Sequence, residues 1–179
     1  DGVHRLDYCR MLMDIDDMPQ AVSCSGGKFF FTDDDQQWPD TMLVNYEYPQ
    51  HVIQYEMRLW SQPRLFNATE GCCIYGETGW LWVTNTAWRA YDAKGKIVQE
   101  SQTDGNEILH AHSRNFLDAM RSRDRGSLNQ EILSGHISSS MCHMGNIAWR
   151  TGKKLRFDDA TETFDDAEAN KFLGREHRK

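Results

Sequence analysis

The sequence contains no long apolar run, no phosphate-binding glycine motif and no excess of positive charge. No apolar stretch approaches the roughly 20 residues that a membrane-spanning helix needs, so we expect no membrane association. Neither G-x-G-x-x-G nor G-x-x-x-x-G-K-[ST] occurs, so a complete nucleotide-using enzyme is not visible in this sequence. Because 20 Lys and Arg face 27 Asp and Glu, giving a net charge of −7, a broad nucleic-acid-binding surface is not expected either.

Disulfide and export signals are also lacking. The five cysteines are an odd number and show no C-x-x-C spacing, which is typical of reduced thiols in a cytoplasmic protein; they are Cys9, Cys24, Cys72, Cys73 and Cys142. The sequence starts at Asp1 without an initiator Met or a signal peptide. We therefore expect a processed chain or one part of a longer protein.

The composition is that of a folded domain. Of the 179 residues, 39% are hydrophobic and 11% are aromatic, which is enough to build a core and argues against disorder. No internal repeat and no clear linker divides the sequence. We therefore predict one domain over residues 1–179.

The hydrophobic pattern predicts strands in the first half and helices in the second. Apolar residues at helical spacing indicate a first helix over 3–14, and a β-type segment over 21–31 follows, with Gly26-Gly27 as a bulge. Alternating residues predict three antiparallel hairpins, formed by 41–48 with 51–60, 71–75 with 80–84, and 88–91 with 96–100. The later segments are predicted as helices over 107–123, 128–150 and 165–173 and as a short strand over 154–157.

This order of elements predicts the fold class. Strands followed by helices, with few β-α-β alternations, are typical of an α+β fold. We expect an open-faced, mostly antiparallel β-sheet with helices packed on one face.

His4 is the first candidate for chemistry. It lies in the first turn of the first predicted helix, and a helix N-terminus favours the neutral form of an imidazole. A neutral imidazole accepts a proton at working pH, as a general base must. The alternative is a histidine that only hydrogen-bonds Asp7 or solvent, and the residue pattern leaves both open.

The sequence does not predict a metal site. Zinc needs about four ligands that converge on one point. On a helix, His110 and His112 would point about 200° apart, and neither Cys142-His143 nor Cys72-Cys73 supplies the remaining spacing. We interpret these residues as core or surface side chains.

Tryptophan and tyrosine are frequent in the predicted strands and allow two interpretations. They could form a platform on which a sugar stacks, or one face of a sheet that packs on helices or on another subunit. These aromatics are Tyr46, Tyr48, Tyr55, Trp80, Trp82 and Trp88. Because more strand surface is apolar than one layer of helices would cover, we favour an interface.

Several segments together resemble one enzyme family. Residues 1–7 (DGVHRLD), 71–79, 112–122 and 143–155 (HMGNIAWRTGKKL), together with 166–170, are similar to the second domain of Gfo/Idh/MocA-type oxidoreductases. The similar segments occur in the expected order over nearly the whole chain.

The resemblance implies a C-terminal substrate-binding and oligomerisation domain whose N-terminal Rossmann partner is absent from this chain. The parent enzyme would use NAD or NADP to oxidise a secondary hydroxyl of a sugar, inositol or related polyol. The family sheet also contributes subunit contacts, so a homo-oligomer is expected. This domain alone should bind no cofactor and should be inactive.

The resemblance also implies a site. The family pattern in this half is Asp-x-x-x-His, in which the histidine acts on the proton of the substrate hydroxyl, and His4 matches that histidine. The acidic position would fall one residue before Asp1, so Asp1 carries over only as a neighbour that could contact the substrate. No cofactor-binding residue can be named. The competing hypotheses are a non-catalytic assembly module and a carbohydrate-binding module that uses the open sheet face.

Overall fold

The computed structural model describes residues 2–61 and 68–175. Its contacts divide the chain into two compact units, one formed by Asp1–Gln62 with His136–Lys179 and the other by Pro63–Gly135. Helix α3 (Ile132–Thr151) begins in the second unit and continues into the first. Each unit has its own sheet, and each is described separately below.

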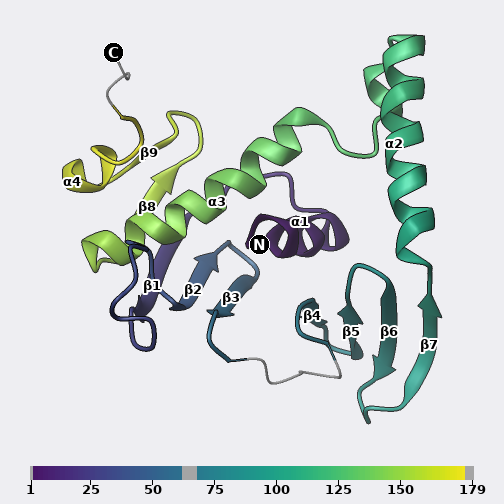
Figure 1. Cartoon of the computed structure of the whole chain (residues 1–179), viewed down its shortest axis with the longest axis horizontal. Coiled ribbons are helices and arrows are strands. Elements are labelled where there is room, and N and C mark those ends of the chain that lie inside the picture. Colours follow the sequence, from purple (N-terminus) through teal and green to yellow (C-terminus); the bar gives the residue numbers. More distant parts are fainter. Residues whose placement is uncertain (1, 62–67, 176–179) are drawn as a thin grey trace. The chain divides into compact units, whose positions relative to one another are not determined.

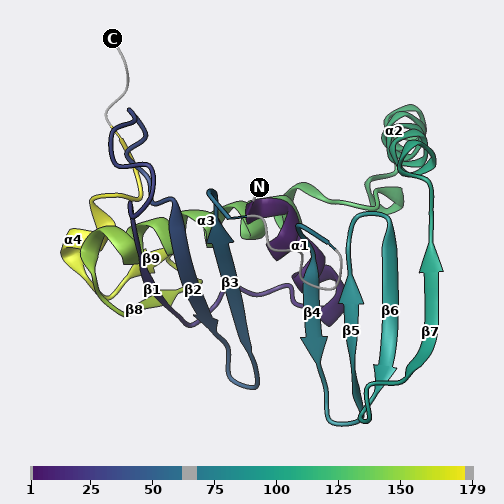
Figure 2. The same cartoon turned by 60° about the horizontal axis from the view of Figure 1, so that its bottom comes forward.

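The first unit contains a five-stranded antiparallel sheet (Figures 1 and 2). The strand order is β3-β2-β1-β8-β9, formed by β1 (Ala21–Gly27), β2 (Thr41–Glu47), β3 (Val52–Arg58), β8 (Leu155–Asp158) and β9 (Thr163–Phe164). Helices α1 (Gly2–Met13), α3 and the short α4 (Ala167–Asn170) complete the unit. Figure 2 shows α1 and α3 behind the plane of β1, β2 and β3.

Alternation along β2 explains why the helices cover only one face of this sheet. Met42, Val44 and Tyr46 are buried, whereas Leu43 between them is exposed. The buried side chains join a core with α1 and α3, and the Tyr46 hydroxyl donates to the Met141 carbonyl at 2.8 Å. The helices therefore lie against the apolar side of the alternating strand.

The second unit contains a four-stranded antiparallel sheet in the order β4-β5-β6-β7. Its elements are β4 (Cys72–Tyr75), β5 (Gly79–Val83), β6 (Ala87–Asp92), β7 (Ile97–Gln102), helix α2 (Gly105–Ser122) and the 3-10 turn η1 (Arg125–Ser127). Asp104 caps α2 by accepting from the backbone N–H of Asn106 at 2.9 Å. The helix ends where Arg123 adopts the left-handed conformation, with φ at 58°.

The α+β class, the antiparallel sheets, the first helix and the three hairpins are confirmed. The strands belong to two sheets within the described residues, rather than to one. Whether residues 1–179 form a single domain stays a prediction.

Two predictions for the segment 21–31 were wrong. The strand β1 ends at Gly27, and Phe29 to Phe31 form a turn, because their backbone N–H groups bind the Asp40 carboxylate instead of a neighbouring strand. The expected bulge at Gly26-Gly27 does not form, since both residues pair in register with β2. A Cβ on Gly26 would lie 2.3 Å from the carbonyl oxygen of Thr41, so close strand approach explains that glycine.

The ends of the later helices also differ from the prediction. Helix α3 begins at Ile132 instead of Leu128, because the Asn115 side chain donates to the Ser127 carbonyl and accepts from the backbone N–H of Asn129. Such local bonds compete with helix formation. The predicted helix over 165–173 contains only the four residues of α4, and β9 was not predicted. In the part of the chain that is described, no helix combines the length and apolar character needed to cross a membrane.

Candidate active site

His4 lies on the exposed side of α1. Leu6, Cys9 and Arg10 are buried and share one face of this helix through i, i+3 and i+4 spacing. At about 100° per residue, His4 points roughly 160° away from Leu6. The structure therefore leaves the predicted base accessible while the opposite face anchors the helix.

A network of hydrogen bonds between buried polar side chains attaches α1 to α3. The Arg10 guanidinium donates from Nη1 to Ser138 Oγ at 2.7 Å, and Ser138 Oγ donates to Asp7 Oδ1 at 2.7 Å. Arg10 also donates from Nη2 to the Ile15 carbonyl at 2.8 Å. Arg10 is 1% exposed and Ser138 is fully buried, whereas the Asp7 side chain keeps 28% of its surface exposed. These hydrogen bonds fix the side chain of Asp7, which lies one helical turn after His4.

The sequence analysis missed this chain of contacts, although a signal existed. Arg10 falls at the position four residues after Leu6, on the apolar face of the predicted helix. A charged residue on such a face indicates a buried partner, because an unpaired buried charge is very costly.

The first turn of α1 packs on two groups that stay protonated. A Cβ placed on Gly2 would lie 3.2 Å from the Tyr55 hydroxyl and 3.4 Å from Cys142 Sγ. Burial raises the pKa of Tyr55 and the pKa of Cys142. Neither group is therefore a ready base or nucleophile near neutral pH. Among the described residues of the first turn, Gly2 to Arg5, His4 is the exposed side chain.

The other histidine candidates are exposed side chains of helices α2 and α3. Asp1 lies outside the described residues. His110 and His112 are exposed on α2 in the second unit, and His143 is exposed on α3. Over residues 2–61 and 68–175, no three His, Cys, Asp or Glu side chains gather closely enough to hold a metal ion.

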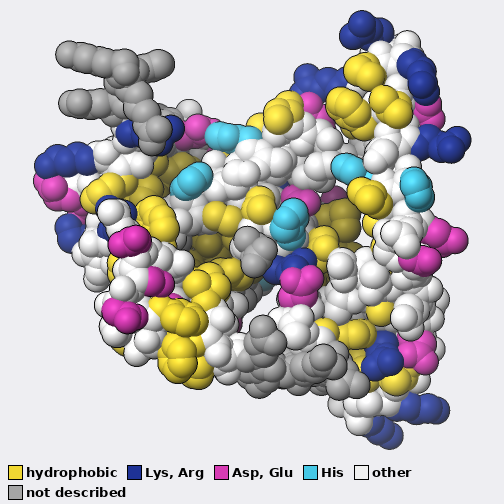
Figure 3. All heavy atoms as spheres, viewed as in Figure 1, with side chains coloured by type: hydrophobic (Ala, Val, Ile, Leu, Met, Phe, Trp, Pro, Cys, Tyr) yellow, Lys and Arg dark blue, Asp and Glu magenta, His cyan; other side chains and the backbone are white. Residues whose placement is uncertain are grey.

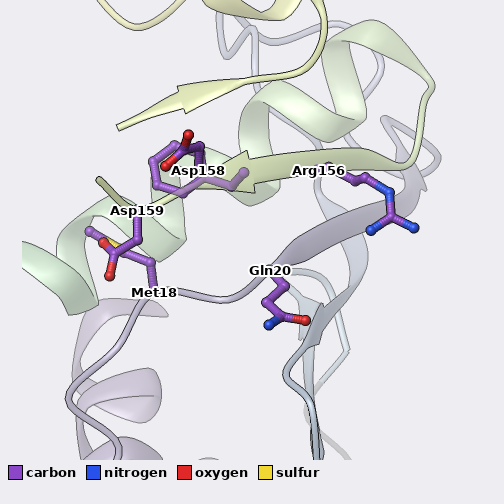
Figure 4. Close-up of a pocket in the computed structure, with 6 residues that line it drawn as sticks. Met18, Gln20, Arg156, Asp158 and Asp159 are labelled. Carbon is purple, nitrogen blue, oxygen red and sulfur yellow. The ribbon is translucent and has the colours of Figure 1, made fainter. Parts of the chain in front are cut away.

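A shallow hollow in the first unit does not include His4 either. It has a volume of about 500 Å³ and lies beside β8. Figure 4 shows Arg156 at one end, Asp158 and Asp159 at the other, and Gln20 between them. Asp158 Oδ1 already accepts from the backbone N–H of Ala160 at 2.9 Å. Because its charged groups do not converge, this hollow offers no arrangement for acid–base chemistry.

Asp40 organises an exposed aromatic turn in the same unit. Its buried carboxylate accepts from the backbone N–H groups of Phe29, Phe30 and Phe31 at 2.8 to 3.0 Å and from the Thr41 hydroxyl at 2.8 Å. Burial would raise the pKa of Asp40, but these hydrogen bonds outweigh it and lower the pKa to about 2. Phe29 and Phe30 are mostly exposed, and Figure 3 shows hydrophobic and acidic side chains near this loop.

A row of stacked rings lies on the four-stranded sheet. Strand pairing places Trp80 between Tyr75 and Tyr91. Trp80 stacks on Tyr91 with ring centroids 3.7 Å apart and faces Tyr75 at 6.2 Å. Both faces of the Trp80 ring are thus directed at neighbouring rings, so this aromatic row presents mainly ring edges.

Comparison with solved structures shows the fold that this chain shares. A proposed oxidoreductase from Klebsiella pneumoniae matches with a TM-score of 0.60 at 13% identity, covering 96% of this chain and 51% of that protein. The proposed oxidoreductase yvaA from Bacillus subtilis matches with a TM-score of 0.61 at 9% identity, covering 88% of this chain and 50% of that protein. This chain therefore spans about half the length of these structures. A comparison with curated proteins found no match.

A comparison with models of protein families identifies the family of this chain. The oxidoreductase family's C-terminal alpha/beta domain, of the Gfo/Idh/MocA type, matches residues 88–179. That segment includes nearly all of the third hairpin, formed by β6 and β7, together with α2, α3 and the C-terminal strands and helix. The chain thus belongs to the Gfo/Idh/MocA oxidoreductase family as a C-terminal domain.

Proposed function

We propose that this chain is the substrate-binding half of an NAD(P)-dependent oxidoreductase that acts on a secondary hydroxyl of a sugar, inositol or related polyol. In this proposal His4 accepts the hydroxyl proton. Asp1, next to the first turn of α1 in the sequence, is proposed to contact the substrate.

The observation that carries the proposal is the exposed face of α1. His4, Tyr8, Met11 and Leu12 follow i, i+4, i+7 and i+8 spacing, on the side opposite to the buried residues. Met11 is 63% exposed and Leu12 is 40% exposed. A histidine at the end of an uncovered apolar stripe is suited to a site that is completed by substrate and further polypeptide.

The described strands do not form the parallel unit that usually binds a dinucleotide. Every strand pair of the described sheets is antiparallel, so the described part contains no β-α-β unit with a phosphate-binding turn. A nicotinamide held elsewhere in a whole enzyme would take up hydride. The task of this chain is to hold the carbinol oxygen and to accept its proton at His4.

The test compares variants of a longer protein that also contains a dinucleotide-binding half. His4→Ala should reduce turnover about 100-fold or more, because general-base catalysis contributes factors of about 10² to 10⁴. Cofactor affinity, measured by nicotinamide fluorescence, should stay unchanged. His143→Ala is the matched control, since it removes another exposed histidine from the same unit.

Two outcomes would contradict the proposal. Unchanged turnover in His4→Ala would remove His4 from the site. Equal binding of NAD(H) by this chain and by the longer protein would refute the division of labour between the halves.

We also propose that the chain forms homo-oligomers through the four-stranded sheet. Tyr75, at the outer end of the aromatic row, is 74% exposed, which supports an interface there. Sedimentation equilibrium should show a dimer or larger assembly, and Tyr75→Glu should shift it toward monomer. Val52→Glu, at an exposed apolar position of the other sheet, should leave the assembly intact. A monomer at high protein concentration would contradict the interface.

A further inference from the structure

Arg150 lies between two aromatic rings at the C-terminal end of α3. Its guanidinium carbon lies over the ring of Trp38, 4.4 Å from the ring centre, and over the ring of Phe172, 5.5 Å from the ring centre. Trp38 belongs to the loop between β1 and β2, and Phe172 follows α4, so three separate segments of the first unit meet at this guanidinium. Contact with two rings restricts its orientation, because a guanidinium is attracted to the face of an aromatic ring.

The N–H donors of Arg150 stay available for a ligand. Over residues 2–61 and 68–175, its side chain has neither a hydrogen-bond acceptor nor an ion-pair partner. Other arginines of the chain pair with a carboxylate at 2.6 to 3.1 Å, namely Arg58, Arg89, Arg121 and Arg125. Arg150 is thus an oriented cation that this chain does not neutralise, although its net charge is −7.

Two further polar side chains lie on the same face of α3. His143, Asn146 and Arg150 follow i, i+3 and i+7 spacing. This row lies opposite to the buried face of the helix, which contains Met144 and Ala148. In the described part of the chain, the side chains of His143 and Asn146 form no hydrogen bond with another residue. An amide and an imidazole can both donate to a ligand that a guanidinium also binds.

Helix α3 carries no acidic side chain that would oppose an anion. At its C-terminal end, the Ala148 carbonyl accepts from the Thr151 hydroxyl at 3.3 Å and from the Gly152 N–H at 2.9 Å. Just after the helix, the Asp166 carboxylate is bound by Lys153. Free carbonyls and carboxylates repel an anion, so these bonds reduce the repulsion at the end of the helix.

We infer that Arg150, together with Asn146 and His143, binds an oxyanion group of a small ligand, a phosphate or a carboxylate. Arginine binds both groups through two parallel N–H···O bonds, which are stronger than hydrogen bonds between neutral groups. The rings of Trp38 and Phe172 would fix the guanidinium, so that less side-chain freedom is lost when the ligand binds. Asn146, one turn away on the helix, would donate to a further oxygen of the ligand.

The test is a titration of this 179-residue chain, labelled with ¹⁵N, with sodium phosphate and separately with sodium acetate. Sodium chloride keeps the ionic strength constant. At least one of the two anions should shift the Arg150 Nε–H signal to saturation, with a dissociation constant on the order of 1 mM. The signal is assigned through Arg150→Lys. The anion with the higher affinity identifies the oxyanion group that the site prefers.

Arg114 is the matched control within the same titration. It is also an exposed arginine on a helix, and it also has no ion pair within the described ranges, but no aromatic ring lies beside its guanidinium there. Its Nε–H signal should therefore show no saturating shift.

Two phenylalanine variants test the contribution of the rings. Phe172→Leu removes one ring beside Arg150 and keeps every charge, so the affinity should fall about three- to fivefold. Phe29→Leu removes another exposed ring of the first unit and should leave the affinity unchanged.

Three results would overturn the inference. These are no saturating shift of the Arg150 signal with either anion, binding of equal affinity at Arg114, and equal affinities in the Phe172 and Phe29 variants. Because the assay needs neither a dinucleotide nor turnover, its failure would leave the proposal for His4 unaffected.

Discussion

Replacing Ser138 by alanine tests whether the buried polar chain anchors the helix that carries His4. Ser138 Oγ accepts from Arg10 and donates to Asp7, both at 2.7 Å, and each of these hydrogen bonds involves a charged group. A hydrogen bond to a charged group contributes about 1.5 to 3 kcal/mol to stability. The loss of both would therefore cost at most about 3 to 6 kcal/mol.

Part of that loss is recovered in the variant. Arg10 keeps its bond to the Ile15 carbonyl, and its Nη1 lies 3.9 Å from Asp7 Oδ1, so the two charges still attract each other. Asp7 is partly exposed, so water can solvate the oxygen that no longer accepts from Ser138. We expect Ser138→Ala to lower the free energy of unfolding by about 2 to 3 kcal/mol.

The assay is urea denaturation followed by circular dichroism, with Ser139→Ala as the matched control. Ser139 is the next residue on α3 but is exposed, so its replacement should change stability by less than about 0.5 kcal/mol. Equal stabilities of the two variants would refute the argument that this chain of contacts anchors α1. A change in the slope m would indicate that a unit unfolds separately.

Two further predictions concern packing and pH. The pKa of Asp40 is lowered to about 2, so its contribution to stability is complete above its unfolded pKa near 4 and is lost as the pH falls through about 2. Urea midpoints at pH 6 and pH 2 should show this loss, and the loss should be smaller in Asp40→Asn; an identical pH dependence in both proteins would contradict it. A side chain on Gly145 would lie 3.0 Å from the Tyr46 hydroxyl, so Gly145→Val should cost about 1 to 3 kcal/mol in thermal unfolding. Gly135→Ala has open space on α3 and should be neutral or gain up to about 1 kcal/mol; similar effects of both replacements would argue against this packing.

The strands and first helix could be predicted because their signal is periodic. Met42, Val44 and Tyr46 alternate with less buried residues, and the structure buries that set against the helices. The face of α1 formed by Leu6 and Cys9 follows from helical spacing in the same way. Burial of one face fixes both the element and its register, so the pattern in the sequence is sufficient.

The exceptions depend on single side chains that act over a distance. Phe29 to Phe31 have the composition of a strand, but Asp40 binds their three N–H groups from about ten residues away. The Asn115 side chain binds the backbone of Ser127 and Asn129, twelve and fourteen residues away, and so prevents α3 from starting at Leu128. The hydrophobic pattern does not reveal such side-chain-to-backbone hydrogen bonds. One acceptor can nevertheless outweigh the structural preference of a whole segment.

For the candidate site, the sequence pattern predicts the position of His4 but not its role. The position of His4 follows from helical geometry, since a residue two places before Leu6 must point away from the buried face. Its proposed role comes from the resemblance and not from periodicity, because one exposed histidine has the same spacing whether or not it accepts a proton. Arg10 and Ser138 hold the helix from its buried side, and His4 stays exposed on the opposite side. In the proposed site, which would be shared between two halves, this anchoring would hold the base in position before the other half covers it.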